Sequence, residues 1–217
     1  MEKDFVTPIA DGIAHPRVQS ESPGCLPCRP MARVPFSRFR NNRGNMAKLV
    51  ELSPAGELDK TPAAFLTDGH VETVEATLPE LQSILAGLSN NEAIGLGVCD
   101  RAPAAVVTSA ALPDHSDAVA RTLDFFHMPQ GPALGFFDSD TDETPDEVLG
   151  DISEAFPSFS SAAKLLVPST SAGIYRTGDD RPVSSSHGVH IYFTVKHGPD
   201  SERFGAVLCK RLWLAGH

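Results

Sequence analysis

The stretch ALGFFDSDTDETPDEV (133–148) carries the most direct information about the fold of this chain. Its first six residues form a short apolar run with the length of a buried strand, and that run ends in Asp138. Thr144-Pro-Asp-Glu147 then has the residues of a capping box with proline in the first turn, which predicts a helix running to about Phe156. A strand that leads through an acidic turn into a capped helix indicates a mixed fold.

Similar signals extend in both directions along the chain. A second capping box at Thr77-Leu-Pro-Glu80 predicts a helix to about Leu88, and apolar spacing predicts helices over 115–127 and from Asp200 onward. Apolar or alternating segments predict strands at AKLVELS (47–53), HVETVEAT (70–77), AIGLGVC (93–99), AAKLLVPS (162–169), GIYR (173–176) and GVHIYFTV (188–195). Together these elements predict an α+β domain in which helices flank a central sheet.

Composition limits the extent of the domain and its setting. Residues 1–45 are rich in Pro, Arg, Asn and Ser without periodicity, so we predict a disordered segment or a translated leader there, and a domain over residues 46–217. No apolar run approaches the roughly 18 residues of a membrane helix, and no secretory signal opens the chain, which predicts a cytoplasmic protein without a membrane partner. The net charge of −10 argues against non-specific electrostatic binding of nucleic acid over the whole surface.

Asp138 and Asp140 form the first candidate site. Side chains two residues apart on a strand point to the same side, and the rise of about 3.3 Å per residue separates these carboxylates by roughly 6–7 Å. Mg²⁺ and Mn²⁺ prefer such oxygen ligands and keep positions open for the phosphate oxygens of nucleotidyl transfer. The residues alone leave two other interpretations open, namely a solvated acidic turn and the Asp-x-Asp site of a sugar-nucleotide transferase.

The second candidate site is the polar segment SSSHGVH (184–190), which runs directly into the apolar strand IYFTV. Alternation places His190 on the opposite side of that strand from Val189 and Ile191. A histidine at this position can donate a hydrogen bond to a triphosphate oxygen, and the hydroxyl of Ser184 can assist. The alternative is a structural histidine bonded to a backbone carbonyl.

Taken in this order and at this separation, FFDSD (136–140) and SSSHGVH (184–190) resemble two motifs of the archaeo-eukaryotic primase superfamily. The resemblance is closest to the primase-polymerase domains of phages and plasmids, and it covers roughly Met46 to His217. It implies a catalytic core with a mainly antiparallel or mixed sheet, an RRM-like module and flanking helices. It also implies a DNA primase or polymerase that performs metal-dependent, template-directed nucleotidyl transfer in DNA replication.

The resemblance implies a role for each motif residue. Asp138 and Asp140 would coordinate catalytic Mg²⁺ or Mn²⁺, and His190 would contact the phosphates of the incoming nucleotide. The implied partners are a single-stranded DNA template, nucleoside triphosphates and a replicative helicase domain or protein.

The serine of the second motif has several candidates. Ser184 has the spacing of the motif, but Ser169 and Ser171 lie on a segment that a neighbouring strand could bring close. Arg176 is a candidate nucleotide contact. Other possible phosphate or template contacts are Lys164, Lys196, Lys210 and Arg211.

The primase superfamily also uses a third carboxylate, at the end of a later strand. After His190 the chain has only Asp200 and Glu202, which helix capping explains. We therefore expect a domain incomplete at its C-terminus. Two alternatives to the active enzyme follow: a catalytically inactive remnant that binds nucleotide, DNA or another protein, and an Asp-x-Asp glycosyltransferase.

Overall fold

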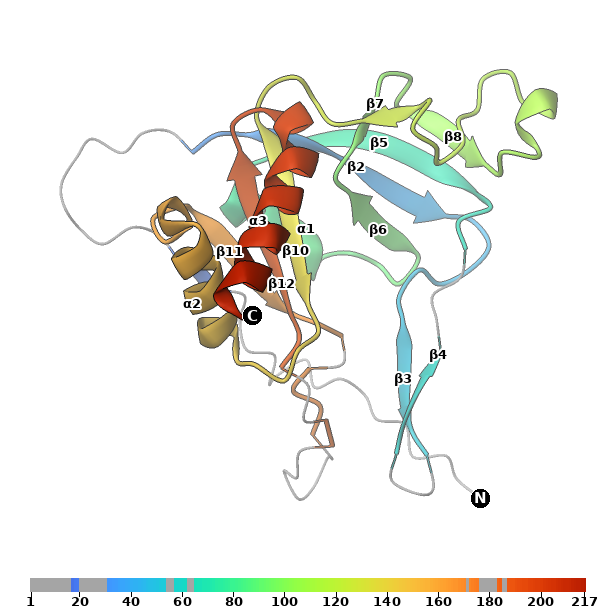
Figure 1. Ribbon diagram of the computed structural model, residues 1–217. Helices are drawn as coiled ribbons and strands as arrows, with labels where there is room; N and C mark the ends of the chain where they lie inside the picture. Colours follow the sequence, from blue (N-terminus) through green and yellow to red (C-terminus); the bar gives the residue numbers. More distant parts are fainter. Residues whose placement is uncertain are drawn as a thin grey trace.

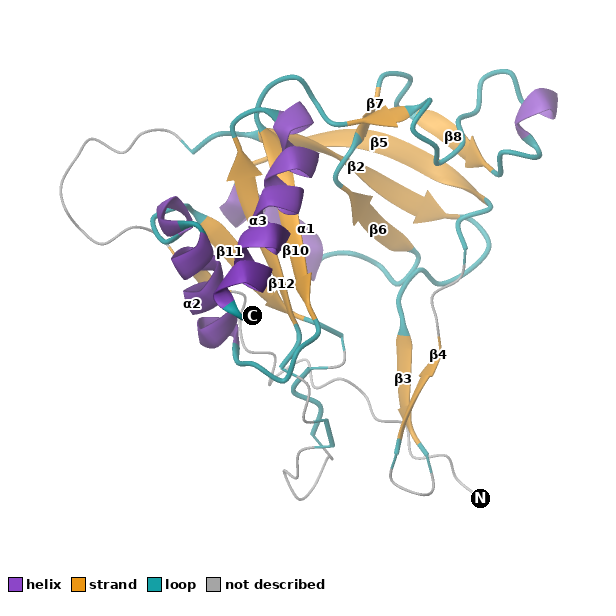
Figure 2. Cartoon of the chain, viewed as in Figure 1, coloured by secondary structure: helices purple, strands orange, loops and turns teal. Residues whose placement is uncertain are grey.

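The computed structural model describes residues 17–19 (backbone only), 31–53, 57–61, 65–170, 172–175, 183–184 and 187–217. This part of the chain forms three α-helices and several antiparallel sheets, two of them four-stranded (Figure 1). The predicted α+β class is confirmed, although the strands divide between two main sheets instead of forming one (Figure 2). None of the described helices is long and apolar enough to cross a membrane.

The acidic pair belongs to a sheet built around strand β12 (Val189–Val195), which we call the β12 sheet. β12 pairs antiparallel with β10 (Ala133–Ser139) on one side and with β11 (Lys164–Pro168) on the other. β1 (Arg17–Gln19) pairs with the far edge of β11, which gives the order β1-β11-β12-β10.

The other four-stranded sheet, which we call the β2 sheet, is centred on β2 (Val34–Asn41) and β5 (Asp68–Ala76). β6 (Glu92–Gly95) lies beside β2, and β8 (Ala104–Val107) lies beside β5. Two smaller sheets pair β3 (Leu49–Leu52) with β4 (Leu58–Thr61), and β7 (Val98–Cys99) with β9 (Phe126–His127).

The helices begin where the sequence predicts. α1 (Leu78–Ala86) and α2 (Pro145–Ala155) each follow a complete capping box, in which the threonine hydroxyl and the glutamate carboxylate accept each other's backbone N–H. α3 (Ser201–Ala215) ends at Gly216, whose φ of 95° lies in the left-handed region that favours glycine. Single 3-10 turns occur at Leu112–Asp114, Pro157–Phe159 and Gly198–Asp200.

The two faces of the β12 sheet pack against different parts of the molecule, because successive side chains of a strand point to opposite faces. One face, with Ile191 and Phe193, packs against Ile152 of α2 and Leu208 of α3. Figure 1 shows α2 and α3 on the near side of this sheet and α1 on the far side.

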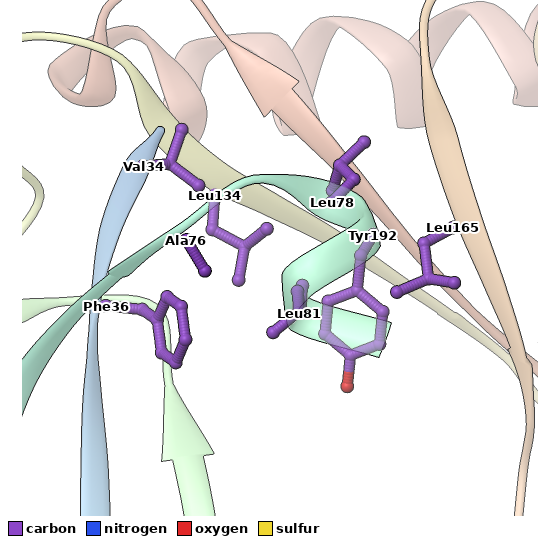
Figure 3. Close-up of a cluster of buried hydrophobic side chains, with 8 residues drawn as sticks. All are labelled: Val34, Phe36, Ala76, Leu78, Leu81, Leu134, Leu165 and Tyr192. Atoms are coloured by element: carbon purple, nitrogen blue, oxygen red, sulfur yellow. The ribbon is translucent and has the colours of Figure 1, made fainter. Parts of the chain in front are cut away.

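The opposite face joins the β12 sheet to α1 and to the β2 sheet through one buried cluster (Figure 3). The cluster consists of Val34, Phe36, Ala76, Leu78, Leu81, Leu134, Leu165 and Tyr192. Burying each large apolar side chain of this kind stabilises the fold by about 1.5–3 kcal/mol. The strands of this face continue beyond the cluster to the acidic pair.

Strand β2 corrects, for Val34–Asn41, the prediction that residues 1–45 are disordered or a leader, and residues 1–16 and 20–30 lie outside the described part of the chain. Its residues form the centre of a sheet, and Val34 and Phe36 are almost completely buried. Phe39 is buried on the other face, in a second cluster with Val71. Since β2 buries apolar side chains on both faces, its apolar residues do not alternate simply, and the arginines between them conceal the strand.

The helix predicted over 115–127 is wrong. Val119 instead pairs with β8: its N–H donates to Ala105 O at 2.9 Å, and its carbonyl accepts from Val107 N at 3.0 Å. Leu123 is 94% exposed, so the apolar residues with helical spacing do not share one buried face. Pairing with a sheet edge has overridden the local pattern.

Candidate functional site

The register between β10 and β12 places Asp138 directly opposite His190. His190 Nε2 lies 3.3 Å from Asp138 Oδ1, and both groups reach solvent, with 29% and 50% of their side chains exposed. The two candidate motifs, which lie far apart in the sequence, therefore form one contact at the end of the β12 sheet.

The next row on the same face consists of Asp140, Gly188 and Ser169. The Ser169 N–H donates to Gly188 O at 2.8 Å, which extends the pairing of β11 and β12 by one residue. A Cβ on Gly188 would lie 2.5 Å from Ser169 Oγ and 3.0 Å from Asp140 Oδ1. A side chain at position 188 would displace these two oxygens, which approach the same place from neighbouring strands.

Aromatic rings lie beneath these two polar rows. The Phe136 ring centroid is 5.3 Å from that of His190 and 5.0 Å from that of Tyr192. Burial, and to a smaller extent the charge of Asp138, raises the pKa of Tyr192 to about 12. At neutral pH the phenol is therefore protonated. Asp138 thus lies next to the poorly hydrated rings of Phe136 and Tyr192.

The acidic turn after β10 contains carboxylates that accept hydrogen bonds from the protein, whereas Asp138 and Asp140 have no cationic side chain beside them in the described segments. Glu147 accepts the Thr144 N–H and hydroxyl, both at 2.8 Å, and these hydrogen bonds hold the pKa of Glu147 below its usual value. Glu143 accepts the Thr141 hydroxyl at 3.2 Å. By contrast, no Lys or Arg of the described segments pairs with Asp138 or Asp140. Two such carboxylates repel each other, and a divalent cation relieves that repulsion.

These two carboxylates fit a hard divalent cation in donor type and in accessibility. Both are exposed oxygen ligands on one strand face, so water or phosphate oxygens can complete the coordination shell. Across the described part of the chain, no three His, Cys, Asp or Glu side chains are grouped as a metal site. The described segments therefore offer such a cation two carboxylates, without a third ligand of this kind grouped beside them.

The structure distinguishes among the serine candidates. Ser169 is the serine that the structure brings into the row with Asp140. Ser184 lies in the connection between β11 and β12, where its N–H donates to Ile174 O at 3.3 Å. Ser171 and Arg176 lie outside the described residues.

Two of the basic residues considered as phosphate contacts lie on the opposite face from Asp138. Lys164 Nζ donates to Ser160 O at 3.0 Å, and burial lowers the pKa of this lysine. Arg211 donates to Ala155 O at 3.1 Å, between α3 and α2. Neither residue therefore serves the candidate site.

A concavity of about 330 Å³ lies elsewhere, on the β2 sheet. Its charged lining residues are Arg38, Arg40, His70, Glu72 and Glu92. Arg38 and Arg40 both donate to Glu92, whose side chain is only 2% exposed. A backbone hydrogen bond from Ser89, followed by these guanidinium groups, lowers the pKa of Glu92 to about 2. The buried carboxylate of this concavity is thus paired with two guanidinium groups of the protein, so we place the candidate site at Asp138 and His190.

The residues that sequence reasoning missed are Gly188 and Tyr192. The only local signal for either is that each lies two residues from His190, which puts both positions on its face of the strand.

No protein-family model matches the chain, and no curated protein or solved structure matches it either. A proposal for its function therefore depends on the geometry of the site.

Proposed function

We propose that the β12 sheet is the core of a primase-polymerase domain that binds nucleoside triphosphates with Mg²⁺ or Mn²⁺ for template-directed nucleotidyl transfer. The observation that carries this proposal is the register of β10 with β12, which sets His190 against Asp138 and leaves Asp140 on the same face. Such a site needs an acidic pair for the cation and a nearby donor for phosphate oxygens.

In this proposal each side chain has a separate task. Asp138 and Asp140 would hold the cation, which when bound would neutralise the triphosphate and favour attack of a 3′-hydroxyl on the α-phosphate, with pyrophosphate leaving and the hydroxyl proton passing to water. His190 donates a ring N–H to a phosphate oxygen. Tyr192, which is buried and neutral, excludes water from beneath the site and so strengthens these interactions. Positioning and charge neutralisation supply the catalysis, and no side chain has to act as a base.

The proposed second substrate is a single-stranded DNA template, with a replicative helicase domain or protein as partner. Because the chain carries a net charge of −10, template binding must depend on local contacts.

The second candidate function is nucleotide binding without transfer. It is favoured by the position of Asp200, the first carboxylate after His190 in the sequence. Asp200 pairs with His197 at 3.4 Å and with Arg203 at 3.3 Å. Gly198, two residues earlier, donates its N–H to Gly131 O at 2.9 Å, just before β10 begins and thus at the opposite end of that strand from Asp138. The described site thus has two carboxylates, which suffice to bind a nucleotide with its cation.

Titration with a fluorescent nucleoside triphosphate tests the binding step. We expect the wild type to bind it with Mn²⁺ but not in EDTA, and the double variant Asp138→Ala, Asp140→Ala to bind it in neither. Binding that persists in EDTA would contradict the role of the two aspartates. Preferential competition by a nucleotide sugar would support a glycosyltransferase instead.

Extension of a labelled primer on single-stranded DNA separates the two candidates. Incorporation that requires both Mn²⁺ and the aspartate pair supports nucleotidyl transfer. Metal-dependent binding without incorporation supports the second candidate.

A further inference from the structure

The Ser169 hydroxyl is a buried polar group with no task assigned so far. The residue is 7% exposed, and its Oγ has no hydrogen-bond partner within the described segments. Leaving a buried hydroxyl unpaired is unfavourable. An acceptor within reach of a side-chain rotation would remove that cost.

The space next to this hydroxyl is created by the missing side chain of Gly188. Ser169 Oγ lies 2.5 Å, and Asp140 Oδ1 3.0 Å, from the position that a Cβ on Gly188 would occupy. The two oxygens therefore face one small gap from opposite strands. This gap is on the same face as Asp138 and His190, one row further along.

The two sides of the gap differ in freedom to move. Ser169 is fixed by its backbone, since its N–H donates to Gly188 O at 2.8 Å and its carbonyl accepts from Ala172 N at 3.0 Å. Asp140 is exposed and follows the last residue of β10. Rotation of the aspartate side chain therefore brings its carboxylate to the hydroxyl at little cost.

We infer that Ser169 is a positioning residue whose hydroxyl donates a hydrogen bond to Asp140 across the gap left by Gly188, fixing one carboxylate oxygen and presenting the other to the cation. The identity of that cation rests on the proposed function, whereas the hydrogen bond itself requires only a rotation of the Asp140 side chain. A neutral donor suits this task because it orients the carboxylate without competing for its charge. Hydrogen bonds to metal ligands commonly have this effect on metal affinity.

The first test measures Mn²⁺ binding by electron paramagnetic resonance of the free ion. We expect Ser169→Ala to bind Mn²⁺ about tenfold more weakly than the wild type. Ser201→Ala is the matched control, because Ser201 Oγ is also buried without a partner among the described residues but belongs to α3. It should bind Mn²⁺ as the wild type does. If Ser169→Ala also binds like the wild type, the inference is overturned while the proposed metal site stands.

The second test needs no metal. In EDTA, we expect Ser169→Ala to lower the Tm when it is introduced into the wild type. Introduced into Asp140→Ala, the same change should leave the Tm unchanged, because this variant lacks the carboxylate that accepts the hydrogen bond. If the wild type binds no Mn²⁺, the proposed metal site fails, and this cycle alone decides the inference. Equal Tm changes in the two backgrounds would then overturn the positioning role.

Discussion

The two main sheets each have a face that begins in the shared apolar cluster and ends in charged side chains, but they balance those charges differently. On the β2 sheet, the carboxylate of Glu92 is buried and accepts hydrogen bonds from Arg38, Arg40 and the Ser89 backbone. On the β12 sheet, Asp138 is half exposed and lies beside the imidazole of His190.

The comparison shows that a carboxylate at the polar end of a strand face can serve two purposes. Glu92 has its hydrogen-bonding capacity filled by the protein, which makes it a structural group. Asp138 and Asp140 lack guanidinium or ammonium partners within the described residues, so they remain available to a cation from outside. The difference lies in the neighbouring strands and not in the carboxylates themselves.

The largest expected effect is the loss of cation binding when both aspartates of the β12 sheet are replaced. The double variant Asp138→Asn, Asp140→Asn should lose measurable Mn²⁺ binding in isothermal titration calorimetry, because both charged ligands are gone. Its thermal stability should not fall, since the change also removes like-charge repulsion. Retained binding would show that the cation, if any, lies elsewhere.

Glu92→Gln, on the β2 sheet, should lower stability and leave Mn²⁺ binding unchanged. We expect a loss of about 3 kcal/mol in the free energy of unfolding, because Arg38 and Arg40 lose their shared buried partner. Urea denaturation measures this loss, and Mn²⁺ binding should be unchanged. A variant as stable as the wild type would refute the structural role of Glu92.

Acid should reproduce part of this effect. The pKa of Glu92 is about 2 in the folded protein, against the ordinary value of 4.5, so its contribution to stability is present above pH 4.5 and is lost as the pH falls toward 2. Between pH 7 and pH 3 this group should account for a loss of about 2 kcal/mol. Urea titrations across this range should show a shallower decline for Glu92→Gln. Parallel declines would contradict the low pKa.

The smallest expected effect concerns His190. We expect His190→Gln to weaken binding of a nucleoside triphosphate about tenfold, the value of one charge-assisted hydrogen bond, while Mn²⁺ still binds. Fluorescence titration of the nucleotide, with calorimetry of Mn²⁺ alone as control, measures both. Equal losses of Mn²⁺ and nucleotide would indicate that the histidine serves the cation site instead.

Part of the fold was readable from the sequence and part was not. The strand and the helix on either side of the acidic pair were predicted correctly, because an apolar run marks the strand and a complete capping box marks the start of the helix. β2 was missed because it buries apolar side chains on both faces and carries arginines between them. A helix was wrongly predicted over 115–127 because its apolar residues have helical spacing. In the structure, Val119 instead pairs with strand β8. The choice among the serines also stayed open, because it depends on which strand lies beside β12.

The sequence by itself determined what depends on neighbours within a few residues. The capping boxes at Thr77 and Thr144 form by local hydrogen bonds, and Asp138 and Asp140 share a side because a strand repeats every two residues. Tertiary structure decided the rest, since strand register depends on how both faces of a sheet pack. Only that packing sets His190 opposite Asp138 and brings Ser169 to the space beside Gly188.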